Sequence, residues 1–256
     1  MDNYTNYTFN PYAVVDTIET HWKEFANKLG VNKFILGISG GIDSTCVTAL
    51  ACKIFGRENV YGISMPCDEQ HDIVDVIHVF QHFGINRLDF NIGEVNHAIL
   101  TGIENNAIAV TAQTKTNLPA RLRMATVYAF AQSLNALVLN TCNLSETLMG
   151  YDTLWGDDCG SYAPIQELTK TEVRQIAEYL GVPNDLVNKT PIDGLQGNTD
   201  EENFGFTYAE LDAYIRSGII TGNVPKMIAR NKASKFKMEM IHLTGPKFGF
   251  PNTFND

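Results

Sequence analysis

A glycine-bearing turn between a strand pattern and a helix pattern restricts the fold of this chain more than any other feature. The apolar run 34–38 leads into Ser39-Gly40-Gly41-Ile42-Asp43-Ser44, and a helical pattern follows at once over 45–50. Paired glycines allow a sharp backbone turn, and the free N–H groups at the start of a helix attract anions. The segment therefore predicts a loop that holds phosphate groups, to which the hydroxyls of Ser39 and Ser44 add donors.

Asp43 indicates which kind of phosphate loop this is. The loop lacks the Gly-Lys-Ser/Thr ending of the common nucleotide-binding P-loop, and this disfavours an ordinary P-loop NTPase. A bare carboxylate repels a polyphosphate, so Asp43 beside the loop indicates a Mg2+ ion between the two. The alternative is a plain glycine turn in which Asp43 only caps the helix.

Strand and helix patterns alternate through the first half of the chain. Asn10 and Pro11 start a helical pattern that Gly30 ends. Strand patterns then occupy 34–38, 60–64, 88–92 and 136–140, and helical patterns occupy 44–55, 70–83, 94–106 and 118–134. This alternation predicts an α/β fold, a doubly wound parallel sheet with helices on both faces, in which ligands bind at the carboxyl ends of the strands.

Two helix starts mark the second half of the chain. The segments 169–172 and 207–210 each match the capping box, a Thr followed three residues later by Glu. Between them, residues 181–206 are rich in Gly, Pro, Asn and Asp, and we expect a long functional loop there. Neither an internal repeat nor an interdomain linker is visible, so residues 1–256 are expected to form a single domain.

Charge and composition narrow the possible partners. The formal net charge is -10 and no block of Lys and Arg opposes it locally, so a nucleic acid partner is disfavoured. An apolar share of 44% is ample for a large core. The cysteines form no C-x-x-C pair, and the chain has neither a leader-like start nor an apolar run of about 20 residues. We therefore expect a cytoplasmic protein with reduced thiols and no membrane contact.

The loop at 39–44 resembles the pyrophosphate loop of the N-type ATP pyrophosphatase superfamily. The resemblance implies a Rossmann-like fold of the adenine nucleotide alpha hydrolase type. Four further segments resemble the NAD synthetase family in order and spacing. They are Met65 to Asp72, Asn117 to Tyr128, Asn140 to Asp158, and a group of short motifs between Pro164 and Ile215.

The resemblance implies roles for individual residues. Contacts to ATP and its pyrophosphate are implied for Gly37, Ser39, Gly40, Gly41, Asp43, Ser44, Gln70, Thr141, Lys170 and Ile192. Contacts to deamido-NAD are implied for Asn117, Arg121, Tyr128, Asp157 and Lys237. Asp43 and Glu146 are the implied ligands of Mg2+, and Asp43, Lys170 and Asp157 are the implied catalytic residues. In the family, the helix that carries Asn117 also helps to form a homodimer.

Three positions depart from the family pattern. Ile192 stands where many members carry Ser or Thr, so a hydroxyl contact to phosphate is missing or is supplied elsewhere. Phe236 replaces the histidine of a C-terminal S-x-H-K motif, which leaves Lys237 as the substrate contact. Asp158 follows Asp157 where some members have glycine, and the sequence assigns it no role.

The function that the resemblance implies is the last step of NAD biosynthesis. The nicotinate carboxylate of deamido-NAD would be adenylated by ATP, and ammonia would displace AMP to give NAD, AMP and pyrophosphate. The expected partners are ATP, deamido-NAD and ammonia, with Mg2+ as cofactor. A glutaminase domain is not expected, because only one helix pattern precedes the strand of the loop. Two alternatives stay open: another amide-forming or thiolating member of the superfamily, and a non-catalytic nucleotide-binding sensor.

Overall fold

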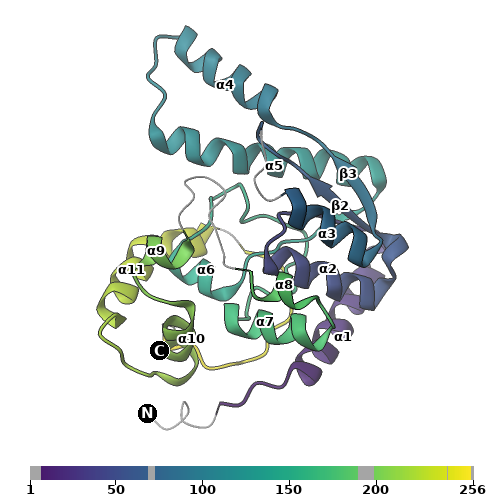
Figure 1. Cartoon of the computed structure of the whole chain (residues 1–256), viewed down its shortest axis with the longest axis vertical. Helices are drawn as coiled ribbons and strands as arrows, with labels where there is room; N and C mark the ends of the chain where they lie inside the picture. The colour runs from purple at the N-terminus through teal and green to yellow at the C-terminus, as the bar shows by residue number, and fades with distance from the viewer. Residues whose placement is uncertain (1–6, 69–72, 190–198, 241, 255–256) are drawn as a thin grey trace.

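A four-stranded parallel sheet forms the centre of the molecule (Figure 1). The computed structural model describes residues 7–68, 73–189, 199–240 and 242–254. The strands are β1 (Phe34–Gly37), β2 (Val60–Ser64), β3 (Asn86–Asp89) and β4 (Leu137–Val138), in the order β3-β2-β1-β4. Every pairing is parallel, so the predicted parallel α/β fold is confirmed. The strand order reverses between β1 and β4, and such a reversal is where open α/β sheets bind ligands.

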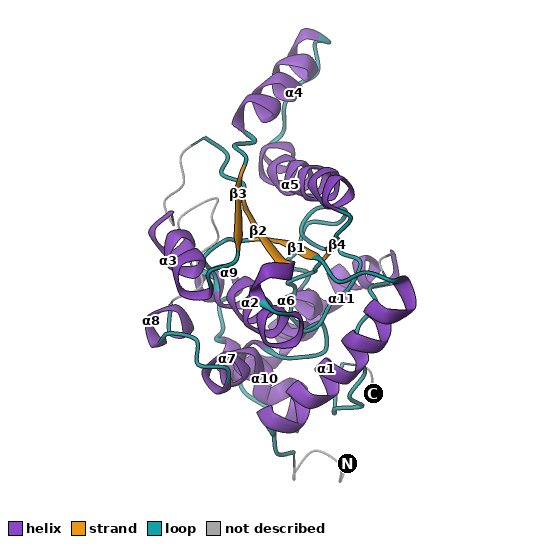
Figure 2. Ribbon diagram, turned by 90° about the vertical axis from the view of Figure 1, so that its right-hand side faces the viewer, coloured by secondary structure: helices purple, strands orange, loops and turns teal. Residues whose placement is uncertain are grey.

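Helices cover both faces of this sheet. The first half of the chain forms α1 (Pro11–Leu29), α2 (Ile42–Phe55), the short 3-10 helix η1 (Arg57–Asn59), α3 (Ile73–Phe83), α4 (Gly93–Asn105) and α5 (Ala112–Leu134). The second half forms α6 (Leu144–Met149), α7 (Lys170–Tyr179), α8 (Asn184–Val187), α9 (Asp200–Phe204), α10 (Tyr208–Ser217) and α11 (Val224–Met240). In Figure 2, α5 lies over one face of the sheet, and α2 and α3 lie over the other.

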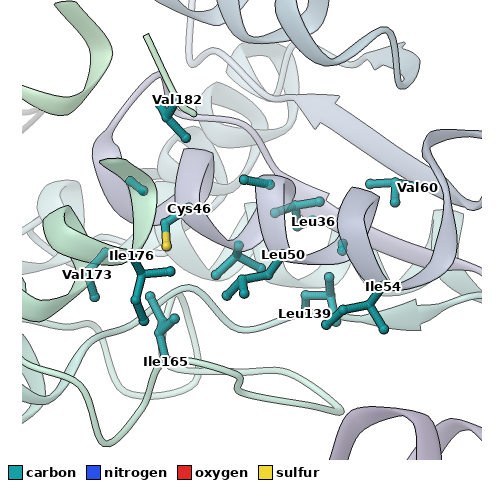
Figure 3. Close-up of a cluster of buried hydrophobic side chains, with 14 of the residues drawn as sticks. Leu36, Cys46, Leu50, Ile54, Val60, Leu139, Ile165, Val173, Ile176 and Val182 are labelled. Carbon is teal, nitrogen blue, oxygen red and sulfur yellow. The ribbon is translucent and has the colours of Figure 1, made fainter. Parts of the chain in front are cut away.

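The alternation of side chains along β1 explains the two layers of core. Phe34 and Leu36 are buried in the cluster that includes α1, α2 and α7, whereas Ile35 between them is buried on the side of α5. Consecutive strand residues point to opposite faces, so a strand that is apolar throughout fits a sheet covered on both. Figure 3 shows the first cluster, in which Leu50 of α2 and Ile176 of α7 take part.

A separate apolar cluster holds the later helices together. It joins α6, α9, α10 and α11, and its buried members include Leu148, Phe204, Tyr208, Leu211 and Met227. Figure 1 shows these helices gathered at one side of the molecule. The cluster fixes the position of α6, which carries the predicted metal ligand Glu146.

Some predicted element boundaries were wrong by several residues. Helix α5 begins at Ala112, with Thr111 as its N-cap, and Pro119 lies inside it. Proline usually marks the first turn of a helix, which explains why the predicted start near 118 was late. The strand predicted at 88–92 is assigned to 86–89, although backbone hydrogen bonds from Phe90 and Ile92 continue its pairing.

The prediction of one long loop over 181–206 is also wrong in part. Helices α8 and α9 lie within this segment. Leu186 and Val187 are buried on α8, and α9 starts at a capping box formed by Thr199 and Glu202. Short helices of this kind carry too few residues for a visible apolar period. Residues 190–198 lie outside the described part of the chain.

The two capping boxes predicted from the sequence are confirmed. The side chains of Thr169 and Thr207 cap α7 and α10 and accept the N–H groups of Glu172 and Glu210. All five cysteines are free thiols. Within the described ranges, no helix combines the length and the apolar character that a membrane crossing requires.

Candidate active site

The loop after β1 is closed by its own hydroxyl groups. Gly41 is the N-cap of α2, and its carbonyl accepts a hydrogen bond from Ser44 Oγ at 3.1 Å. Ser39 Oγ accepts the N–H of Gly41 at 3.2 Å and lies 3.1 Å from Ser44 Oγ. Gly40 has a φ of 76°, and a Cβ there would lie 2.8 Å from the Cβ of Asp75. Only glycine fits this position, so the sharp turn predicted from the paired glycines is confirmed.

Asp43 does not cap its helix. Because Gly41 is the N-cap, Asp43 lies within the first turn of α2. Its Oδ1 accepts a hydrogen bond from Asn143 Nδ2 at 2.8 Å, and its Oδ2 lies 2.6 Å from Lys170 Nζ. The carboxylate therefore connects the loop to segments that follow about 100 residues later, which excludes the plain capping role.

Lys170 joins the two predicted metal ligands. Its Nζ lies 2.6 Å from Asp43 Oδ2 and 2.8 Å from Glu146 Oε1. Only 3% of the Lys170 side chain is exposed, against 15% of each carboxylate. The ring of Tyr208 also faces this ammonium group, with the ring centroid 5.1 Å from Nζ. The structure thus brings Asp43, Glu146 and Lys170 together, and we call them the buried trio.

Burial sets the electrostatics of the buried trio. Burial and then the charge of Asp43 raise the pKa of Glu146 to about 7, although Lys170 acts in the opposite direction. Burial also disfavours the charge of Lys170, but the carboxylates of Asp43 and Glu146 outweigh it and raise the pKa of the ammonium group. Lys170 therefore stays charged at physiological pH, and Glu146 is the member whose charge is hardest to maintain.

Hydrogen bonds at the start of α7 hold Lys170 in place. The buried Asp212 of α10 accepts hydrogen bonds from Ser145 Oγ at 2.6 Å and from the N–H of Thr171 at 2.8 Å. Ser145 Oγ in turn accepts the N–H of Lys170 at 3.1 Å. A carboxylate at this place satisfies N–H groups that have no partner within the helix. The same network includes Ser145 of α6, so it positions Lys170 and Glu146 together.

A second group of predicted residues surrounds residues 150–161, which we call the acidic loop because it contains Asp152, Asp157 and Asp158. Lys237 of α11 donates a hydrogen bond to the carbonyl of Gly150 at 2.8 Å and pairs with Asp152 at 2.9 Å. Arg121 of α5 donates to the carbonyl of Leu154 at 3.2 Å. Two predicted substrate contacts, one on α5 and one on α11, therefore hold the acidic loop.

The remaining residues predicted to contact the substrate also lie at the acidic loop. Thr153 donates its N–H to Asp157 Oδ1 at 2.7 Å and its hydroxyl to Asn117 Oδ1 at 3.4 Å. Tyr128 lines a cavity together with Gly160. Asn117, Arg121, Tyr128, Asp157 and Lys237 are thus brought together around the acidic loop.

The acidic loop is attached to the segment that follows β4. Asn140 Nδ2 donates to the carbonyls of Asp157 at 3.3 Å and Cys159 at 2.9 Å. Gly160 approaches Asn140 so closely that a Cβ there would lie 2.7 Å from its backbone nitrogen. Thr141, a predicted ATP contact, follows Asn140 and is partly exposed. The segment 140–150 therefore connects the acidic loop with Glu146 of the buried trio.

Two predicted ATP contacts, Gln70 and Ile192, lie outside the described residues. Two other residues had no role in the sequence analysis. Asn143 forms a capping box with Glu146 and also donates to Asp43. Lys189 lies 2.6 Å from Asp75 and 3.5 Å from the carbonyl of Gly40, which brings a second cation to the phosphate loop.

The capping-box spacing could have revealed Asn143 before the structure was known. Lys189 begins one of the family-like motifs between Pro164 and Ile215, but that motif gave no sign of a contact with the phosphate loop. Lys189 lies 149 residues from Gly40 in the sequence, and no local pattern links positions so far apart.

Comparison with known proteins places the chain in a family. A family model described as NAD synthase matches residues 14–243. The chain belongs to the NAD synthase family. An NH3-dependent NAD+ synthetase of Thermococcus sibiricus is 42% identical over 201 residues, which cover 78% of this chain and 78% of that protein. Another, from Malacoplasma penetrans, is 31% identical over 229 residues and covers 89% and 92% of the two chains.

A solved structure has the same fold. NMN synthetase from Francisella tularensis superposes with a TM-score of 0.84 at 29% identity, over 94% of this chain and all of the other. The family model and the curated relatives confirm the resemblance to the NAD synthetase family that the sequence shows. The part of the chain that matches the NAD synthase model contains both the buried trio and the acidic loop.

Proposed function

We propose that this member of the NAD synthase family is an ammonia-dependent NAD synthetase, a ligase that uses ATP to amidate deamido-NAD. The observation that carries the proposal is the buried trio beside the phosphate loop. Two carboxylates next to a phosphate site weaken the binding of a polyphosphate unless a cation lies between them. A protein that only sensed a nucleotide would have no use for this arrangement. Curated relatives named NH3-dependent NAD+ synthetases support the proposal.

The buried trio fits a Mg2+ ion that arrives with ATP. Asp43 and Glu146 both contact Lys170 Nζ, so their oxygens are close enough to share one cation. Over the described ranges, no group of three or more His, Cys, Asp or Glu side chains is arranged to hold a metal. Mg2+ commonly takes only one or two carboxylates, together with water and substrate phosphates. Bound there, it would neutralise charge on the phosphates.

The first proposed step is adenylation of the substrate. The nicotinate carboxylate attacks the α-phosphorus of ATP, and the bond to pyrophosphate breaks. Lys170 and the N–H groups at the start of α2 would bind the negative charge of the departing pyrophosphate. The carboxylates around Lys170 keep its ammonium group charged for this task. The adenylate that forms is an acyl donor, because AMP can leave where an oxide ion cannot.

The second proposed step is attack by ammonia. The lone pair of NH3 forms the bond to the acyl carbon, the bond to AMP breaks, and the nitrogen loses a proton. Asp157 is the proposed residue that orients ammonia or accepts this proton, and the N–H of Thr153 holds its Oδ1 at 2.7 Å. The acidic loop is also a proposed barrier to water, which would otherwise hydrolyse the adenylate.

One assay tests the proposed function. The purified protein is supplied with Mg2+, ATP, deamido-NAD and ammonium, and NAD, AMP and pyrophosphate are measured. We expect the three products in equal amounts. Formation of ADP and phosphate, or a folded protein that makes no NAD, would contradict the proposal.

A second candidate product is favoured by one observation. The structure that superposes with a TM-score of 0.84 is an NMN synthetase, whose product is a mononucleotide. The same chemistry on nicotinate mononucleotide would give NMN. Replacing deamido-NAD by this mononucleotide in the assay compares the two, and we expect the larger kcat/KM for the dinucleotide. A larger value for the mononucleotide would establish the second candidate.

A further inference from the structure

A cavity of about 290 Å³ opens beside the acidic loop. Its lining is mainly apolar and aromatic, with Met124 and Tyr128 of α5, Trp155 of the acidic loop, Met240 at the end of α11, and His242 beyond it. Trp155 is 50% exposed and Tyr128 is 37% exposed, so both rings are accessible. Sites for small molecules usually measure about 300–1,000 Å³. This cavity therefore suits one substituted ring and not a whole nucleotide.

One carboxylate lines the cavity, that of Asp158, and the residue is only 5% exposed. The other two carboxylates of the acidic loop have partners, since Asp152 pairs with Lys237 and Asp157 accepts the N–H of Thr153. For Asp158, the part of the chain that the structure describes supplies neither a hydrogen bond nor an ion pair.

A buried carboxylate without a partner costs stability. Burial and then the charges of Asp152 and Asp157 raise the pKa of Asp158 to about 7, against the effect of Lys237. A cation bound in the cavity would supply the missing partner.

We propose that Asp158 makes this cavity selective for a positively charged aromatic ring. Two aromatic rings and two methionines give a flat ring surfaces to pack against, and the faces of Trp and Tyr attract cations. The carboxylate adds an attraction that a neutral ring of the same shape does not experience. In the proposed reaction this ring is the N-ribosylated pyridinium of the nicotinate nucleotide. The identity of the ring rests on the proposed function, whereas the preference for a positive charge rests on the cavity itself.

Two small probes of the same shape separate charge from fit. 1-Methylnicotinamide is a pyridinium cation, and 3-methylbenzamide has carbon in place of the charged nitrogen. The dissociation constant of each probe is measured by ligand-observed NMR on the wild-type protein and on Asp158→Asn. We expect the substitution to raise Kd for 1-methylnicotinamide by about tenfold and to leave Kd for 3-methylbenzamide within about twofold.

Two further variants serve as controls. Asp16→Asn removes the same charge from an exposed residue of α1 and should change neither Kd. Trp155→Ala should weaken both probes, because it removes a wall of the cavity. Retained binding of 3-methylbenzamide shows that Asp158→Asn is folded at the cavity.

The outcomes for this inference and for the proposed function are distinguishable. If the wild-type protein forms NAD but Asp158→Asn binds 1-methylnicotinamide with the same Kd as the wild-type protein, the inference is overturned and the proposed function stands. An equal loss for both probes would overturn it as well, because the effect would then come from shape. A protein that forms no NAD but shows the charge-dependent loss would support the inference and contradict the function.

Discussion

Among single residues, Asp43 and Glu146 each combine two roles. They balance the buried ammonium group of Lys170, and they are the proposed ligands of Mg2+. When both are ionised, the two carboxylates carry one charge more than the single lysine neutralises. A second cation is therefore favoured in the site, and this explains why a phosphate loop can tolerate acidic neighbours.

Replacing Asp43 by Asn or Glu146 by Gln should lower kcat at least about a hundredfold, since each change removes a proposed metal ligand. Each variant leaves Lys170 one carboxylate, so we expect the free energy of unfolding to fall by only about 1–2 kcal/mol. Pyrophosphate release and urea unfolding measure the two effects. Near-normal turnover of either variant at limiting Mg2+ would show that the metal site is misplaced.

Asp158→Asn should make the ligand-free protein more stable at pH 8. Folding raises the pKa of Asp158 from an ordinary value of 3.8 to about 7, so the folded state holds the proton more tightly. The wild-type protein therefore loses stability from this group as the pH rises from about 4 to about 7, and the amide does not. We expect a gain of about 1–2 kcal/mol at pH 8 that shrinks toward pH 5. Urea unfolding at both pH values measures it, and a gain independent of pH would refute this account.

At the scale of the element, a buried ion pair connects α7 with α10. Arg216 Nη2 lies 2.8 Å from Glu172 Oε2, and Arg216 also donates to the carbonyls of Glu167 at 2.6 Å and Pro251 at 2.9 Å. Glu172 is the capping-box residue of α7, whose first residue is Lys170. The ion pair therefore supports the helix start that positions Lys170, the proposed catalytic lysine.

Arg216→Met should lower the free energy of unfolding by about 3–5 kcal/mol, because the carboxylate of Glu172 would remain buried without a counter-charge. The double variant with Glu172→Met leaves neither charge alone and should recover part of this loss. Urea unfolding of the single and double variants measures the coupling. Losses that simply add would mean that the two residues do not act as a pair.

At the scale of the whole molecule, α4 extends away from the sheet beside α5 (Figures 1 and 2). Several large apolar side chains on and around α4 are exposed, including Phe90, Val95, Ile99 and Ile108. A projecting helix with an apolar surface is typical of a face that a second subunit covers. This arrangement supports the homodimer expected from the sequence, with α5 at the interface.

We expect sedimentation equilibrium to give the mass of a dimer at working concentration. Val95→Glu combined with Ile99→Glu should shift the protein toward monomer, because charged side chains are costly in the centre of an interface. Glu substitutions at exposed positions of α1, such as Tyr12, serve as the control. A wild-type monomer, or a dimer that survives the double substitution, would refute this interface.

The whole chain should use ammonia and not glutamine. Only neutral NH3 has a lone pair with which to attack the adenylate, so activity at fixed total ammonium should rise as the pH increases toward the alkaline range. Initial rates of NAD formation between pH 7 and pH 9 measure this. Glutamine should be inert, and glutamine-supported synthesis at the ammonium rate with free ammonia removed would contradict this expectation.

Local chemistry determined what the sequence predicted correctly. The turn at Gly40 and Gly41, the capping boxes at Thr169 and Thr207, and the alternation of strands and helices depend on residues within a few positions of one another. The assignment of Asp43 and Glu146 as ligands of Mg2+ stays a prediction, and the structure places both carboxylates beside Lys170.

Only the tertiary structure decided which distant side chains meet. Lys189 reaches the phosphate loop, Asp212 accepts the N–H of Thr171 at the start of α7, and Asp158 lines a cavity with Tyr128 and Trp155. The first two contacts join elements that lie far apart in the sequence. The surroundings of Asp158 depend on α5 and α11, which the sequence around Asp158 does not reveal. Burial and pairing are properties of the packed chain, because they depend on what lies around a side chain in space and not on its neighbours in the sequence.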